Sequence, residues 1–265
     1  IIGGRSNVVD GYSCNSTVIG GDGNCICGHD ALSYSFYYGS CNSAIVGGCY
    51  NCICGYDNDS DYGSCNSTII GGYCNQIICD TNASSIIGGC RNTICGYSCD
   101  SSILGGGCGR VNSSCYASIV GGRANRVYNS DYASVIGGCC NCISYNSDYS
   151  SIIGGYCNTI ATESNISSII GGRCNTLTCD SNQSSIIGGC NNYMCCSCNS
   201  VILGGQDLDI CNRDNSVFLN ATTYLKQTVE AAQDITVGTS SVTASFLDGS
   251  IKYLSSLSND FQVDF

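Results

Sequence analysis

A pair of adjacent glycines recurs along most of this chain, and its spacing limits what the chain can fold into. The first glycine of each pair stands at Gly3, Gly20, Gly47, Gly71, Gly88, Gly105, Gly121, Gly137, Gly154, Gly171, Gly188 and Gly204. Successive pairs lie 16 or 17 residues apart, except for two longer steps of 27 and 24 residues. A fixed internal period of this kind is the signature of a repeat architecture, in which each repeat builds one structural unit.

Each repeat carries the same short pattern, for which Ile152-Ile153-Gly154-Gly155 is representative. Two aliphatic residues precede the pair, an apolar residue follows six positions after the first glycine, and ten of the twelve repeats have Asn four positions after it. Sixteen residues are too few for a helical hairpin, and β-branched residues bounded by Gly, Asn and Ser are typical of short strands. We therefore expect an all-β protein, a β-solenoid or β-roll of twelve coils with two short strands in each.

The expected repeat array covers residues 1–210, with insertions at about residues 28–42 and 55–66 in the two long steps. Residues 211–265 lack the glycine pattern and are expected to form a β-rich capping or trimerisation segment. Within it, residues 215–219 open the segment, and residues 234–238 and 241–247 read as strands. Because Ile1 lies inside a repeat, we expect the chain to be a processed form or part of a longer protein.

Neighbouring side chains of a strand point to opposite faces, so one residue of each Ile-Ile pair faces the interior and the other faces outward. Stacking the coils turns the outward residues into a continuous aliphatic stripe, which needs a covering partner. Cyclic self-association as a homotrimer satisfies this need. The glycine pair is expected to make a tight corner, and the Asn to hydrogen-bond its turn in the left-handed backbone region.

The chain repeats the motif S-[ST]-[IV]-[IVL]-G-G-x-x-N-x-[IVLM] from Ile1 to about Ile210. This array resembles the repeat arrays of trimeric tail and surface fibres of phages and large DNA viruses. It is also similar in style to the β-roll heads of trimeric autotransporter adhesins. The resemblance implies a homotrimeric fibre at the surface of a virion or cell, or in the extracellular space, that projects or attaches. The cysteine content departs from both groups.

The chain holds 26 cysteines, and this density favours an oxidising compartment and many disulfides. Cysteines at one phase of the repeat should lie close enough in adjacent coils to be bonded, within a chain or between chains. The candidates are Cys25, Cys27, Cys49, Cys52, Cys54, Cys74, Cys90, Cys108, Cys139, Cys140, Cys157, Cys174 and Cys190.

Zinc or copper binding is the alternative for Cys25-x-Cys27, Cys52-x-Cys54 and Cys195-Cys196-x-Cys198. On a strand, two cysteines one residue apart point their sulfurs to one face. The spacing differs from the C-x(2–4)-C pairs of structural zinc sites, however, and His29 is the single histidine. The sequence therefore favours disulfides over a metal.

The insertions hold two further candidate sites. Tyr34, Phe36, Tyr37 and Tyr38 form an aromatic cluster that either stacks on a sugar or a partner, or packs back on its own scaffold. Asp57, Asp59 and Asp61 resemble the start of a calcium-binding loop, D-x-D-x-D. The glycine and the glutamate that complete such a loop are missing, so a solvated acidic loop is favoured over calcium, and no other cofactor is expected.

Charge and motifs narrow the function. The net charge is −11 and no lysine precedes Lys226, so the chain lacks the basic surface that would bind nucleic acid or an anionic membrane. No apolar run is long enough to insert into a bilayer. No enzyme signature is present. We expect a disulfide-stiffened structural fibre, extracellular or on a virion or cell surface. The alternatives are a self-polymerising extracellular filament, a glycan-binding adhesin head and, ranked lowest, an ice-binding protein.

Overall fold

The computed structural model describes residues 1–265 except residues 12, 29–38, 56–62, 220–233, 238–239 and 244–265. The chain divides into two units, Ile1–Ala221 and Thr222–Phe265. The described residues are all-β and contain no helix, and therefore no helix with the length and apolar character needed to cross a membrane.

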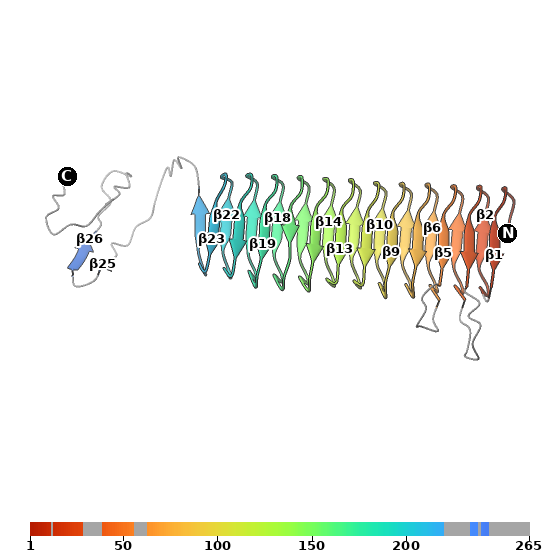
Figure 1. The fold of residues 1–265 in the computed structure, drawn as a ribbon, viewed down its shortest axis with the longest axis horizontal. Helices are drawn as coiled ribbons and strands as arrows, with labels where there is room; N and C mark the ends of the chain where they lie inside the picture. The colour runs from red at the N-terminus through yellow and green to blue at the C-terminus, as the bar shows by residue number, and fades with distance from the viewer. Residues whose placement is uncertain (12, 29–38, 56–62, 220–233, 238–239, 244–265) are drawn as a thin grey trace. The chain divides into compact units, whose positions relative to one another are not determined.

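The first unit is a β-solenoid with two parallel sheets of twelve strands each (Figure 1). One sheet consists of β1 (Val8–Asp10), β3 (Cys25–Cys27), β5 (Cys52–Cys54), β7 (Gln76–Ile78), β9 (Thr93–Cys95), β11 (Arg110–Asn112), β13 (Arg126–Tyr128), β15 (Cys142–Ser144), β17 (Thr159–Ile160), β19 (Thr176–Thr178), β21 (Tyr193–Cys195) and β23 (Asp209–Cys211). The other consists of β2 (Thr17–Ile19), β4 (Ala44–Val46), β6 (Thr68–Ile70), β8 (Ser85–Ile87), β10 (Ser102–Leu104), β12 (Ser118–Val120), β14 (Ser134–Ile136), β16 (Ser151–Ile153), β18 (Ser168–Ile170), β20 (Ser185–Ile187), β22 (Val201–Leu203) and β24 (Val217–Leu219). The expected fold class, an all-β solenoid with two short strands per coil, is confirmed.

Strands of adjacent coils pair in register, so that residues at one phase of the repeat form a column along the solenoid. For example, Ile152 of β16 lies opposite Ile169 of β18, and Ile143 of β15 lies opposite Ile160 of β17. A third line of isolated parallel bridges joins the residues two positions after each first glycine, from Arg5 to Gln206. The columns follow directly from the sequence period, because each coil repeats the phase of the previous one.

The core consists of two facing columns of aliphatic side chains. One column is the first residue of each aliphatic pair, and the other is the apolar residue six positions after the first glycine; Ile152 and Ile160 are both fully buried. The core residues are Val18, Ile26, Ile45, Ile53, Ile69, Ile77, Ile86, Ile94, Ile103, Val111, Ile119, Val127, Val135, Ile143, Ile152, Ile160, Ile169, Leu177, Ile186, Met194 and Ile202. The predicted inward and outward placement of the Ile-Ile pair is confirmed.

The two glycines of a pair have different roles at the corner that follows each even-numbered strand. Both have positive φ, 68° at Gly154 and 80° at Gly155. A Cβ atom on Gly154 would have nothing within 4 Å, whereas one on Gly155 would lie 2.5 Å from the carbonyl oxygen of Gly172 in the next coil. The first glycine is required by its backbone conformation, and the second also by the close approach of the next coil.

The repeated Asn forms a buried ladder through the solenoid. The backbone N–H of Asn158 donates to Oδ1 of Asn141 at 3.0 Å, and Nδ2 of Asn158 donates to the carbonyl oxygen of Gly171 in the next coil at 3.1 Å. The ladder Asn is therefore a connection between coils. The expectation that it occupies the left-handed region is wrong: the residue before it does, as Cys157 with φ 53° shows.

The ladder is interrupted where Gly109 replaces Asn, because glycine offers no amide oxygen to Asn125 in the next coil. Gly109 has no positive φ and is buried, and a Cβ atom there would lie 3.1 Å from Oδ1 of Asn92. We expect Gly109→Asn to raise the free energy of unfolding by about 1 kcal/mol by completing the ladder. Gly107→Asn is the matched control, since it also replaces a glycine but lies outside the ladder. Equal shifts of the thermal midpoint in both variants would contradict this account.

Two buried serine columns, which the sequence reading missed, connect the coils on the other side of the core. Ser167 donates its backbone N–H to Oγ of Ser150 at 3.0 Å, and its own Oγ donates to the carbonyl oxygen of Ser181 at 2.7 Å. Ser147 and Ser164 belong to the second column, and all these side chains are buried. The serine three positions before the first glycine, such as Ser151, is half-buried on the outer face.

The solenoid extends past residue 210, where the sequence placed its end. β24 pairs with β22 in register, with Phe218 opposite the core residue Ile202. Residues 215–219, expected to open the C-terminal segment, thus supply the last strand of the solenoid. In the second unit, β25 (Asp234–Val237) and β26 (Ser240–Thr243) form an antiparallel pair, close to the two strands expected there.

Candidate functional site

The outer face of the even-numbered sheet carries a continuous column of apolar side chains. Its centre is a column that we call the aliphatic ridge: Ile19, Val46, Ile70, Ile87, Leu104, Val120, Ile136, Ile153, Ile170, Ile187, Leu203 and Leu219. Each ridge side chain is 39–50% exposed. The predicted outward stripe is therefore present along the whole solenoid.

Small neutral groups border the aliphatic ridge on both sides. On one side runs the residue two positions earlier in each strand, mostly Ser or Thr, and on the other runs the first glycine, where a Cβ would have open space. None of the residues in strands β2 to β24 of this sheet is charged. In contrast, the odd-numbered sheet carries Asp10, Arg110, Arg126 and Asp209. The charged strand residues of the solenoid thus lie in the other sheet.

The candidate cysteines two and three positions after the first glycine are only partly brought together. Cys49, Cys90, Cys139 and Cys190 share one column, but Tyr73 separates the first two, and other residues separate the rest. Cys140, Cys157 and Cys174 occupy one phase in three successive coils. Cys74 and Cys108 share that phase, and the coil between them presents Arg91. Cysteines of these columns therefore adjoin one another only in short runs.

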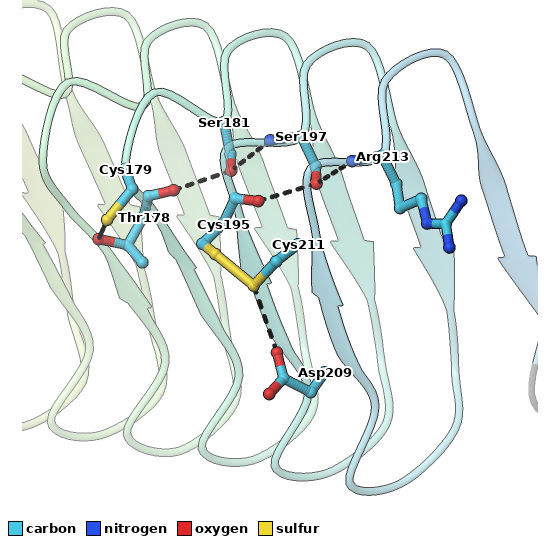
Figure 2. The surroundings of a disulfide bond; sticks show 8 residues. All are labelled: Thr178, Cys179, Ser181, Cys195, Ser197, Asp209, Cys211 and Arg213. Atoms are coloured by element: carbon cyan, nitrogen blue, oxygen red, sulfur yellow. Dashed lines mark hydrogen bonds between the residues drawn. A yellow bond between two sulfur atoms is a disulfide. The ribbon is translucent and has the colours of Figure 1, made fainter.

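One disulfide is present among the described residues, between Cys195 at the end of β21 and Cys211 at the end of β23 (Figure 2). The two Cα atoms are 4.7 Å apart in directly paired strands. Figure 2 shows the adjoining serine column, where the backbone N–H of Arg213 donates to Oγ of Ser197 at 3.0 Å. Neighbouring coils at this phase are therefore close enough for bonding, as the sequence reading proposed, although neither residue was among its main candidates.

The candidates Cys25, Cys27, Cys52 and Cys54 come together on the outer face of β3 and β5. In-register pairing sets Cys25 opposite Cys52 and Cys27 opposite Cys54. The sulfur atoms of Cys25, Cys27 and Cys52 all lie within 4.8 Å of one another, and Sγ of Cys27 is 3.0 Å from Sγ of Cys54. We call these four residues the thiol cluster.

Shared hydrogen bonds shift the thiol pKa values within the thiol cluster in opposite directions. The hydrogen bond with Cys27 raises the pKa of Cys25 to about 11. The pKa of Cys52 is also raised, mainly by its hydrogen bond with Cys25. The hydrogen bond with Cys25 lowers the pKa of Cys27, and the one with Cys27 lowers the pKa of Cys54. Such a cluster loses its first protons readily and holds its last ones tightly, as expected for interacting groups.

A stack of tyrosines is a further feature that the sequence reading missed. The rings of Tyr116 and Tyr132 lie 4.7 Å apart and nearly parallel, and Tyr149 continues the stack at the same spacing. The signal was available, since the three residues share one phase of the repeat five positions before the first glycine. The aromatic candidates Tyr34, Phe36, Tyr37 and Tyr38 and the acidic candidates Asp57, Asp59 and Asp61 lie outside the described residues.

Comparison with known proteins adds no family assignment. The chain matches no protein-family description, and no curated protein is significantly similar to it in sequence.

Proposed function

We propose that this chain is the shaft of a structural fibre, in which the aliphatic ridge is buried against the ridges of two further copies of the same chain. The observation that carries the proposal is the uncharged, ridge-bearing face of the even-numbered sheet. The resemblance of the repeat phrase to viral and phage fibre arrays supports the same reading. In this proposal the fibre lies outside the cell, on a virion or a cell surface, and serves to project or attach.

Burial of the aliphatic ridge is large enough to offset the cost of association. A fully buried aliphatic side chain contributes about 1.5–3 kcal/mol, so covering the remaining exposed part of one ridge residue contributes roughly 1 kcal/mol. The twelve ridge residues then contribute of the order of 10 kcal/mol per copy. This is comparable with the free energy of about 4–15 kcal/mol that association of two chains costs.

The narrowness of the aliphatic ridge favours three copies over two. A column one side chain wide is enclosed more completely by two neighbours around a threefold axis than by one neighbour across a twofold axis. The open space beside each first glycine leaves room for the ridge side chains of a neighbour. Identical phase in all coils lets three copies align along their whole length without a shift.

The cysteines support an extracellular setting in this proposal. A disulfide between coils, such as Cys195–Cys211, ties one coil to the next and limits fraying of the solenoid. Disulfides form and persist in oxidising environments. The proposed shaft is therefore stiffened covalently at the Cys195–Cys211 disulfide.

The test is the native mass of the whole chain, combined with charge substitutions on the aliphatic ridge. We expect a discrete trimer, and we expect the triple variant Ile136→Arg, Ile153→Arg, Ile170→Arg to weaken association at least a hundredfold, because each guanidinium would be buried without a partner. Analytical ultracentrifugation over a range of concentrations measures both.

A matched control uses the opposite sheet. Thr93→Arg, Thr159→Arg and Thr176→Arg place three arginines in the column that already holds Arg110 and Arg126, so the trimer should persist. Circular dichroism checks that both variants keep their strands. A wild-type chain that stays monomeric, or a ridge variant that assembles as the wild type does, would refute the proposal.

A further inference from the structure

The thiol cluster differs from the cysteine pair that forms the disulfide. At β21 and β23, Cys195 and Cys211 have only Tyr193 and Asp209 beside them on the same outer face, so each sulfur has one partner. At β3 and β5, all four outward positions are cysteine. Four neighbouring sulfurs can face one common point, whereas two sulfurs can form only a single pair.

The sulfurs of Cys25, Cys27 and Cys52 converge, and Cys54 joins them through its 3.0 Å contact with Cys27, so the four do not separate into two independent pairs. Cys25 and Cys27 are two residues apart on one strand, where side chains normally stand parallel and about 7 Å apart. Their sulfurs nevertheless lie within 4.8 Å of each other and of Cys52. Among the described residues, this is the one place where three Cys, His, Asp or Glu ligand atoms lie so close together.

These separations suit a single metal ion. With Zn–S bonds of about 2.3 Å, two thiolates on a tetrahedral zinc ion lie about 3.8 Å apart, so shifts of about an ångström bring the sulfurs of Cys25, Cys27 and Cys52 into place. A disulfide needs its two sulfurs at about 2.05 Å. The zinc value lies between the 3.0 Å that separates the sulfurs of Cys27 and Cys54 and the limit of 4.8 Å among the sulfurs of Cys25, Cys27 and Cys52.

The surroundings set the size of the site. The strand before it presents Val8 and Asp10 opposite Cys25 and Cys27, and the strand after it presents Gln76 and Ile78 opposite Cys52 and Cys54. No further cysteine of these two columns adjoins the four. The set therefore matches the four thiolates of a closed structural zinc site, and thiolate ligands favour soft ions such as zinc over magnesium or calcium.

We propose that Cys25, Cys27, Cys52 and Cys54 bind one Zn²⁺ ion as a four-thiolate site that joins β3 to β5. The ion displaces the thiol protons, so that each zinc bound releases protons to solvent and no oxidant is involved. The site links two coils directly before the two insertions of the chain, which gives it a structural role.

The experiment uses the full chain, purified under reducing and oxygen-free conditions and dialysed after addition of Zn²⁺ alone. Elemental analysis should give one zinc per chain. Replacing zinc by Co²⁺ should give the sulfur-to-cobalt charge-transfer and ligand-field absorption of a tetrahedral thiolate site. The double variant Cys25→Ser, Cys52→Ser should lose both signals.

Cys195→Ser, Cys211→Ser is the matched control, because it removes a paired cysteine couple of the same sheet and should keep its zinc. Mass spectrometry after alkylation gives the state of the four thiols in the same samples. Zinc retained in the Cys25→Ser, Cys52→Ser variant would overturn the proposal. So would a wild-type chain that holds no zinc, including one whose thiol cluster has closed as Cys25–Cys52 and Cys27–Cys54 disulfides.

Discussion

Gly155→Ala should destabilise the solenoid by about 2–5 kcal/mol, whereas Gly154→Ala should cost only about 1–2 kcal/mol. Both glycines have positive φ, 68° for Gly154 and 80° for Gly155, so placing alanine in this backbone conformation costs about 1–2 kcal/mol at either site. Only at Gly155 does the new methyl group meet the next coil, with the carbonyl oxygen of Gly172 at 2.5 Å. Forcing an atom into such a packed contact adds about 1–3 kcal/mol.

Chemical denaturation of the two variants and the wild type, followed by circular dichroism, measures the difference. Each variant is the matched control for the other, because both substitutions add one methyl group to adjacent glycines of one corner. Since each coil of a solenoid contacts only its neighbours, hydrogen exchange should locate the loosening around Gly172. Equal destabilisation by the two variants would show that backbone conformation alone explains the glycine pair.

The sequence predicted those parts of the fold that follow from period and side-chain alternation. Ile152 faces inward and Ile153 outward because successive side chains of a strand alternate, and one coil fixes this arrangement for all of them. The aliphatic ridge could be predicted for the same reason. The end of the solenoid could not be predicted, because the repeats were recognised by their glycine pairs and the last pair ends at Gly205. The last coil, with Val217-Phe218-Leu219, keeps the strand pattern without a glycine pair.

The missed features depend on which backbone group of the next coil lies opposite a side chain. Ser150 and Asn158 are both polar residues beside a strand, and no one-dimensional pattern states that each bonds the adjacent coil. Likewise, Cys25-x-Cys27 and Cys52-x-Cys54 showed that four sulfurs share a face, but not that they converge. Convergence depends on side-chain rotamers, which the sequence leaves open.

Asn158→Leu should cost about 3–5 kcal/mol, although leucine is similar in size and the site is apolar on one side. Oδ1 of Asn158 accepts the backbone N–H of Asn175 at 3.0 Å, and Nδ2 donates to the carbonyl oxygens of Gly171 and Gly172 at 3.1 and 3.3 Å. Leucine leaves the N–H of Asn175 and the carbonyl oxygen of Gly171 without this partner. The carbonyl oxygen of Gly172, in contrast, still accepts the N–H of Tyr156 at 3.0 Å. Each buried polar group left unpaired costs about 1–3 kcal/mol.

Thr159→Leu is the control, since Thr159 is the next residue, points outward and is only half-buried. Its substitution should change the free energy of unfolding by less than about 0.5 kcal/mol. For Asn158→Leu, hydrogen exchange should accelerate most at the amide of Asn175, whose acceptor is removed, and less at amides several coils away. An Asn158→Leu chain as stable as the Thr159→Leu chain would mean that the aliphatic columns alone hold the coils together, and that the Asn ladder contributes register without stability.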